Sequence, residues 1–319
     1  MPRGSIVVTG AAGFAGAHLV ALLARESGDR HIEGWARSSS RPAVLAPHVG
    51  WRGADLLDPD AVSRAVADAQ PSEIYHLAGA SHTGASWKQP AAYLEIHVRG
   101  THHLLEAVRR HAPACRVLII SSGMIYRPQD HPVNEDAPLG PVSPYALSKL
   151  AEDQLALYAA THDELDIVVA RPFNHIGPGQ APTFAASSFA RQIAEIELGT
   201  TAPCIAVGNL DAARDISDVR DVVAAYVALM ARGATATAYN VCRGETVTMN
   251  TLLKQLIARS TVSVTLTKDA ARFRPNDVPF LAGDPSRIRA TTGWCATTLL
   301  DTTLSDLLDY WRRALADAR

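Results

Sequence analysis

Three glycines near the start of the chain, Gly10, Gly13 and Gly16, restrict the possible folds more than any other feature. They follow a short apolar run at 6–9 and precede leucines at helical spacing at 17–25, an order that predicts strand, tight turn and helix. Small residues let such a turn approach a pyrophosphate, and the helix N-terminus offers N–H groups to the anion. We therefore predict a dinucleotide site, with a purely structural glycine turn as the alternative. The predicted contacts are Gly10, Gly13, Phe14, Ala15 and Gly16.

Apolar runs alternate with helical patterns along the first half of the chain. The runs at 31–35, 74–77, 117–120 and 167–170 are typical of buried parallel strands, and helical segments are expected at 91–110 and 144–161. The alternation predicts an α/β fold with a Rossmann-type, doubly wound parallel sheet.

The pattern changes near Gly177, where glycines and prolines interrupt the alternation. We expect residues 1–176 to form a dinucleotide-binding domain and residues 177–319 to form mainly a smaller substrate-binding lobe. The segment 238–241 is a candidate strand that returns to the main sheet.

Charge and cysteine content exclude several classes of protein. The chain has 30 Lys and Arg against 32 Asp and Glu, which gives no positive field for nucleic acid. Its four cysteines form no C-x-x-C pair, and its histidines share no metal-ligand spacing with carboxylates, so we expect neither disulfides nor a metal site. We find no membrane-length apolar run and no secretory leader, and we expect a cytoplasmic protein.

The end of the second predicted strand bears on the choice of cofactor. Folds that bind NAD usually carry an acidic residue about 20 residues past the glycines. Here the chain has Arg37 and Ser38, and a guanidinium suits the 2′-phosphate of NADP. NADP(H) is therefore favoured, and NAD(H) stays possible if Arg37 is merely a solvated residue. Asp55 and Leu56 are expected at the adenine edge.

A tyrosine and a lysine four residues apart, Tyr145 and Lys149, lie on one face of a predicted helix. A tyrosine hydroxyl titrates near 10, and a neighbouring ammonium makes it a better acid or base at neutral pH. Ser122 follows the strand at 117–120, at the edge where parallel sheets bind ligands. Such a pair also arises by chance, but together with the glycine turn it predicts a catalytic Ser122, Tyr145 and Lys149.

At this point the sequence resembles the extended short-chain dehydrogenases/reductases that act on nucleotide sugars. The resemblance covers essentially the whole chain and rests on residues 9–16, 76–79, 121–126, 145–149, 171–174 and 214–215. It implies further cofactor contacts at Leu77, Ala78, Gly79 and Pro172, and a homodimer formed through two helices.

Segments 171–179, 207–221, 239–242 and 274–279 are more particularly similar to the branch of this family that reduces GDP-linked 4-keto-6-deoxy sugars. The resemblance implies that Ser122 polarises the C4 ketone, Tyr145 protonates the alkoxide, and Lys149 tunes Tyr145 and holds NADPH. The product would be GDP-D-rhamnose or GDP-6-deoxy-D-talose. The implied substrate contacts are Ser122, Asn174, Asn209, Arg214, Arg274 and Asp277.

Two positions depart from relatives. Related dehydratases carry a catalytic glutamate where this chain has Met124, and a thioether cannot remove a proton. Relatives also usually have glycine where this chain has Arg127, which puts the local geometry of this loop in question.

Two other functions stay open. One is a nucleotide-sugar 4-epimerase with bound NAD, and the other is a non-catalytic dinucleotide-binding regulator.

Overall fold

The computed structural model describes residues 4–40, 46, 48–273 and 278–317. Its centre is a sheet of seven strands, all parallel within the described residues, which confirms the predicted doubly wound α/β fold. The spatial order is β10 (Thr237–Val241), β6 (Ile167–Pro172), β5 (Arg116–Ile120), β4 (Pro71–His76), β1 (Ser5–Thr9), β2 (Ile32–Ala36) and β3 (Gly50–Gly53).

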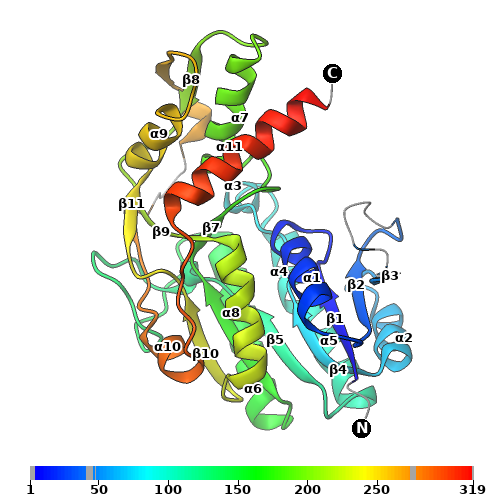
Figure 1. The fold of residues 1–319 in the computed structure, drawn as a ribbon. Coiled ribbons are helices and arrows are strands. Elements are labelled where there is room, and N and C mark those ends of the chain that lie inside the picture. The colour runs from blue at the N-terminus through cyan, green and yellow to red at the C-terminus, as the bar shows by residue number, and fades with distance from the viewer. Residues whose placement is uncertain (1–3, 41–45, 47, 274–277, 318–319) are drawn as a thin grey trace.

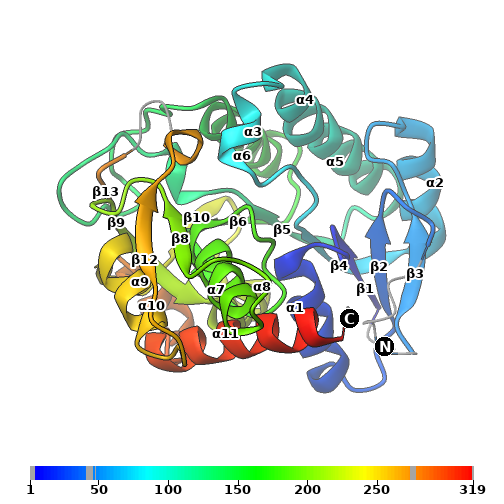
Figure 2. The ribbon, with the colours of Figure 1, turned by 90° about the horizontal axis from the view of Figure 1, so that it is seen from above.

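Helices cover both faces of this sheet (Figure 2). One face carries α1 (Phe14–Glu26) and α8 (Val219–Arg232), with α10 (Ser286–Thr292) beside α8. The other carries α2 (Pro59–Ala69), α5 (Gly100–His111) and α6 (Pro144–His162). Because side chains alternate along a strand, Leu118 packs toward α1 and α8 while Val117 and Ile119 pack toward α5 and α6. All three are fully buried, as expected for a parallel sheet covered on both sides.

The second lobe lies at the carboxyl-terminal edge of the main sheet (Figure 1). The chain leaves β6 directly into β7 (Asn174–Ile176), which pairs with β9 (Ala213–Asp218). The lobe also contains β11 (Thr246–Thr248), β13 (Phe280–Leu281), the pair β8 (Cys204–Val207) and β12 (Thr265–Lys268), α7 (Ala185–Glu197), α9 (Met249–Ile257) and α11 (Leu300–Ala316). Its own apolar core joins α7, α9 and α11.

The expectation that residues 238–241 return to the main sheet is correct, because β10 forms its edge strand beside β6. The helix expected at 91–110 is instead divided into α4 (Pro90–Leu94), a π-helical turn (Glu95–Arg99) and α5. A π turn inserts an extra residue, and such turns often occur at functional sites. The short helix α3 (Thr83–Ser86) and 3₁₀ turns at Gly123–Ile125 and Ala270–Arg272 complete the elements.

Candidate functional site

The glycine turn between β1 and α1 has no room for side chains. Gly10 has a φ of +70°, and a Cβ on it would lie 2.8 Å from the Ala78 nitrogen. A Cβ on Gly16 would lie 2.2 Å from the Gly10 oxygen. Gly13 precedes α1, and no side chain caps this helix, so its first N–H groups are available to an anion. The turn therefore has the form of a cradle for a pyrophosphate.

The predicted adenosine contacts lie at neighbouring strand ends. Arg37 and Ser38 follow β2 and are both exposed, and Asp55 follows β3, also exposed, with its carboxylate accepting from the Leu57 N–H at 3.0 Å. Leu56 is buried. Because β1, β2 and β3 are adjacent and parallel, these side chains share one edge of the sheet with the glycine turn.

The predicted catalytic residues come from β5 and α6. Ser122 lies just past β5 and caps the following 3₁₀ turn, its hydroxyl accepting from the Met124 N–H at 3.2 Å. Tyr145 lies in the first turn of α6, which begins at Pro144 with the Ser143 hydroxyl as its N-cap.

Lys149 connects these elements. Its ammonium donates to the Ile120 carbonyl at 2.8 Å, two residues before Ser122. A Cβ on Gly79, in the turn after β4, would lie 3.8 Å from the same nitrogen. The ammonium also contacts the carboxylate of Glu152 at 2.6 Å. The structure thus brings Lys149 to both the serine strand and the predicted cofactor turn.

His97, on the π turn, supports the start of α6. Its Nε2 accepts from the Ala80 N–H at 3.1 Å, so a neutral ring carries its proton on Nδ1, which lies 2.8 Å from the Ser148 hydroxyl. Ser148 in turn donates to the Tyr145 carbonyl at 2.8 Å. Burial and the charge of Lys149 lower the pKa of His97 to about 2, which keeps the ring neutral. Its ring packs edge-on against the Tyr145 ring, with centroids 6.0 Å apart.

A buried ion pair holds the loop that follows Ser122. Arg171 donates to the Asp153 carboxylate through two nitrogens, each at 2.9 Å, and to the Tyr126 hydroxyl at 2.9 Å. Tyr126 then donates to the Asn240 side chain at 2.7 Å. The Arg171 side chain, in the motif at 171–174, therefore makes its hydrogen bonds to other residues of the protein.

The two departures from relatives fit locally. The Arg127 N–H donates to the Pro138 carbonyl at 2.9 Å, and Arg127 does not adopt a positive φ, so a side chain is tolerated there. Met124 accepts a weak hydrogen bond from the Thr83 hydroxyl at 3.7 Å. At the position of the dehydratase glutamate, this protein therefore has the Met124 sulfur, which contacts Thr83 of α3.

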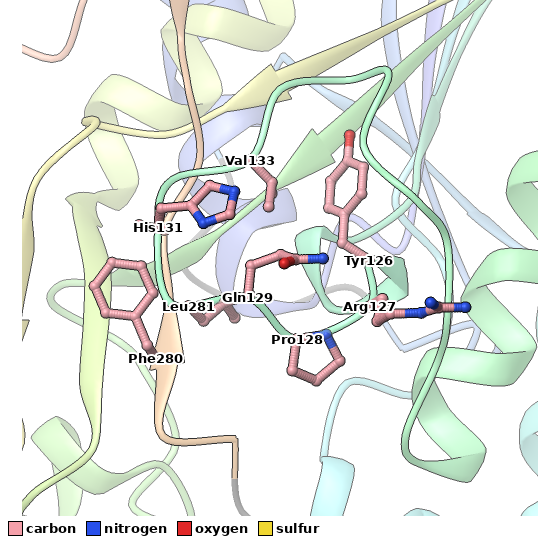
Figure 3. A pocket seen from close by; sticks show the side chains of 9 residues that line it. Tyr126, Arg127, Pro128, Gln129, His131, Val133, Phe280 and Leu281 are labelled. Carbon is pink, nitrogen blue, oxygen red and sulfur yellow. The ribbon is translucent and has the colours of Figure 1, made fainter.

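A small hollow lies beside the loop that follows Ser122 (Figure 3). In Figure 3 the Arg127 side chain extends away from the other labelled residues. None of Ser122, Tyr145 and Lys149 lines this hollow, so it is separate from the predicted catalytic side chains. Its lining is Tyr126, Arg127, Pro128, Gln129, His131, Val133, Phe280, Leu281 and Ala282.

The predicted substrate residues are only partly described. Asn174 is exposed at the start of β7, next to the predicted cofactor contact Pro172, which is buried at the end of β6. Asn209 accepts from the Asp211 N–H at 3.0 Å, and Arg214 donates to the Ala213 carbonyl at 2.9 Å. Arg274 and Asp277 lie outside the described residues.

Next to this region, His175 stacks on Phe14 with ring centroids 5.9 Å apart. This contact joins the second lobe to the helix that begins at the glycine turn. In the described part of the chain, no helix is long and apolar enough to cross a membrane.

Sequence reasoning missed two supporting side chains, Glu152 and His97. Glu152 could have been found, because it stands three residues after Lys149 on a predicted helix and so shares its face. His97 was weighed only as a possible metal ligand. Its inward position depends on the π turn, for which the sequence gives no clear signal.

Comparisons with known proteins agree with this geometry. A family model described as GDP-mannose 4,6 dehydratase matches residues 7–307. The chain is 35% identical to the GDP-6-deoxy-D-mannose reductase of Pseudomonas aeruginosa, over 96% of each chain. A solved structure of RMD from Pseudomonas aeruginosa, complexed with NADPH, has a TM-score of 0.85 at 33% identity and covers 98% of this chain and 99% of that one. MoeE5 in complex with UDP-glucose and NAD has a TM-score of 0.84 at 30% identity, over 98% and 100% of the two chains.

Proposed function

Since the chain belongs to the GDP-mannose 4,6-dehydratase family, we propose that it is an NADPH-dependent reductase of the C4 ketone of GDP-4-keto-6-deoxy-D-mannose, in deoxysugar biosynthesis. The similarity to a GDP-6-deoxy-D-mannose reductase over 96% of both chains carries the proposal. Met124 supports it, because a thioether at this position cannot serve as the base of a dehydratase. The product is GDP-D-rhamnose or its C4 epimer, GDP-6-deoxy-D-talose.

The cofactor site fits a dinucleotide on the evidence of the glycine turn, where a Cβ on Gly10 or Gly16 would collide with backbone. The uncapped start of α1 meets the pyrophosphate, Arg37 and Ser38 meet the 2′-phosphate, and Lys149 holds the ribose near Gly79. Bound NADPH supplies the hydride. NADH is a possible second reductant, since an NAD complex exists among the similar structures.

The chain's own groups handle the oxygen of the ketone. The Ser122 hydroxyl donates a hydrogen bond to it, and Tyr145 transfers a proton to the alkoxide as it forms. Lys149, fixed at the end of β5, supplies positive charge near the tyrosine. Asn174, Asn209 and Arg214 are proposed to hold the sugar nucleotide, together with Arg274 and Asp277.

We further propose that residues 1–176, apart from β7 with Asn174, bind mainly the cofactor and that residues 177–319 bind mainly the sugar nucleotide, with β10 returning to the first unit. A cytoplasmic location, where NADPH is available, belongs to the same proposal.

Two chains are proposed to pair through α6. Its side chains Leu147 and Tyr158 are 50% and 58% exposed, which is unusual for large apolar groups. Light scattering after gel filtration should give twice the chain mass of 34.0 kDa. A monomeric mass at assay concentration would contradict the dimer.

The test is to supply GDP-4-keto-6-deoxy-D-mannose with NADPH or NADH and to follow cofactor oxidation together with NMR of the sugar. Faster oxidation of NADPH than of NADH is expected, and the configuration at C4 identifies the product. No oxidation with either cofactor would overturn the proposal. Tightly bound NAD⁺ in the purified protein would instead favour the 4-epimerase.

A further inference from the structure

A buried carboxylate lies directly behind the Lys149 ammonium. Glu152 is on α6, its side chain has no exposed surface, and its Oε2 lies 2.6 Å from Lys149 Nζ. An ionised side chain in the interior is costly unless it is paired and hydrogen-bonded. Within the described part of the chain, Lys149 makes its ion pair with this carboxylate alone.

The other carboxylate oxygen ends a chain of hydrogen bonds. The Thr101 hydroxyl donates to Glu152 Oε1 at 3.1 Å and lies 3.0 Å from His76 Nε2. His76 Nδ1 lies 2.8 Å from the Thr9 hydroxyl, which accepts from the Ala78 N–H at 3.2 Å. Thr101 donates its one hydrogen to Glu152 and so accepts from His76 Nε2. When His76 is neutral its Nδ1 accepts from Thr9, and the donors run from the Ala78 N–H toward Glu152.

This direction requires a neutral His76 with its proton on Nε2. Burial and the charge of Lys149 lower the pKa of His76 to about 3, in agreement with that state. This series of hydrogen bonds begins at the Ala78 N–H in the predicted cofactor turn and ends, through Glu152, at Lys149. It therefore joins two of the predicted cofactor contacts, Ala78 and Lys149.

The ammonium of Lys149 has three hydrogens to donate. One goes to Glu152 and one to the Ile120 carbonyl, and both acceptors belong to the buried side of the lysine. The remaining hydrogen is left for the side that faces Gly79, where a Cβ would lie 3.8 Å away. The two buried acceptors thus determine which way the ammonium points.

We propose that Glu152 is a positioning residue of the reductase: its buried carboxylate fixes the Lys149 ammonium toward the cofactor and connects it through Thr101, His76 and Thr9 to the cofactor turn. This inference rests on the proposed function. The other titratable groups around the pair do not replace Glu152. His76 and His97 are buried and neutral, while Asp153 is bound to Arg171 at 2.9 Å.

The test replaces the charge and keeps the shape. Glu152→Gln should lower kcat about 10-fold with little change in the KM of the sugar nucleotide, because a misplaced ammonium affects the reaction more than sugar binding. The alkaline limb of the kcat profile should move to lower pH, since the ammonium loses its stabilising carboxylate. The matched control is Glu197→Gln, which removes a carboxylate paired with Arg312 in the second lobe and should change neither quantity.

A second variant covers the case in which Glu152→Gln does not fold. Thr101→Val keeps both charges but removes the hydroxyl that bonds to Glu152. Burial already raises the pKa of Glu152, and the Thr101 hydrogen bond opposes that rise. In Thr101→Val the carboxylate should therefore take up a proton more readily, and the acidic limb of the kcat profile should move to higher pH. Folded variants with the wild-type pH profile would overturn the inference.

A binding titration separates this inference from the proposed function. NADPH and NADH are titrated into the wild type, Glu152→Gln and Glu197→Gln by fluorescence, without any sugar. We expect Glu152→Gln alone to bind the preferred cofactor about 3- to 10-fold more weakly, because the hydrogen bond from the Lys149 ammonium is misaligned but not lost. If the wild type binds cofactor but reduces no sugar, the proposed substrate fails while this comparison still stands. Equal affinities for all three proteins would overturn the positioning role.

Discussion

The two ends of the predicted cofactor surface are built in opposite ways. At the proposed catalytic end, Lys149 and Glu152 are buried, and the hydrogen bonds of these two side chains join them to each other and to the buried Ile120 and Thr101. At the adenosine end, Arg37 and Ser38 are exposed, and in the described residues no hydrogen bond or ion pair holds the Arg37 guanidinium. Both ends lie at the carboxyl ends of strands of the main sheet, with Ser122 after β5, Arg37 after β2, and β4 and β1 between these two strands.

The difference shows how one surface can combine fixed chemistry with adjustable selectivity. Proton transfer needs groups that are already in position, and buried hydrogen bonds provide this. Recognition of a 2′-phosphate needs only a charge on a flexible arm, because the ligand itself completes the site. Changes at the catalytic end should therefore affect turnover and stability, whereas changes at the adenosine end should affect cofactor preference alone.

The largest effect is expected at the catalytic end. Tyr145→Phe removes the proposed proton donor and should lower kcat about 10²- to 10⁴-fold, with NADPH affinity unchanged. Tyr93→Phe is the matched control, because its ring lies 6.3 Å from that of Tyr145 while its hydroxyl bonds to the His82 carbonyl. Steady-state kinetics and cofactor titration check both variants. Equal losses of kcat in the two variants would contradict the proposed role of Tyr145 as the proton donor.

The second prediction concerns stability against pH at the same end. The pKa of His97 in the folded state is about 2, against 6.5 for an ordinary histidine. The unfolded chain thus binds more protons below pH 6.5, and stability is lost as the pH falls from there. At pH 5 this histidine alone should cost about 2 kcal/mol of unfolding free energy.

His97→Gln keeps a donor and an acceptor but cannot take up a proton, so its stability should fall less between pH 7 and pH 5. Denaturant unfolding of both proteins at the two pH values measures the difference. The same dependence on pH in variant and wild type would show that His97 does not contribute to it.

The adenosine end should respond to Arg37→Ala with a smaller and more selective change. Losing one charge-assisted contact to the 2′-phosphate should reduce the preference for NADPH over NADH about 10-fold. The KM for NADH and the melting temperature should stay unchanged, because Arg37 is exposed. An unaltered preference would mean that another group reads the phosphate.

The smallest expected effect is that of salt. Raising ionic strength from about 0.05 M to about 0.5 M should increase the KM for NADPH a few-fold and that for NADH less, since exposed charges are screened. The buried pair at Lys149 is screened little, so kcat should hardly change. A fall in kcat that matches the rise in KM would contradict the contrast between the two ends.

Sequence reasoning predicted local units well where a single pattern carried the information. The glycine turn, the strand before it and the helix after it are where they were expected, with α1 spanning Phe14–Glu26. The return of residues 238–241 to the main sheet was expected, but its neighbouring strand was not identified, because pairing with β6 joins segments far apart in the chain. The π turn at Glu95–Arg99 was missed, since its residues fit an ordinary helix equally well.

Local sequence by itself determined the glycine turn, the α/β alternation and the Tyr145–Lys149 pair, because turn sterics and helical spacing act over a few residues. Only the tertiary structure decided what stands behind Lys149. Thr9, His76, Thr101 and Glu152 come from β1, β4, α5 and α6, and no spacing along the chain relates them. They meet because a buried charge must find partners, and those partners are supplied by whichever elements pack around it.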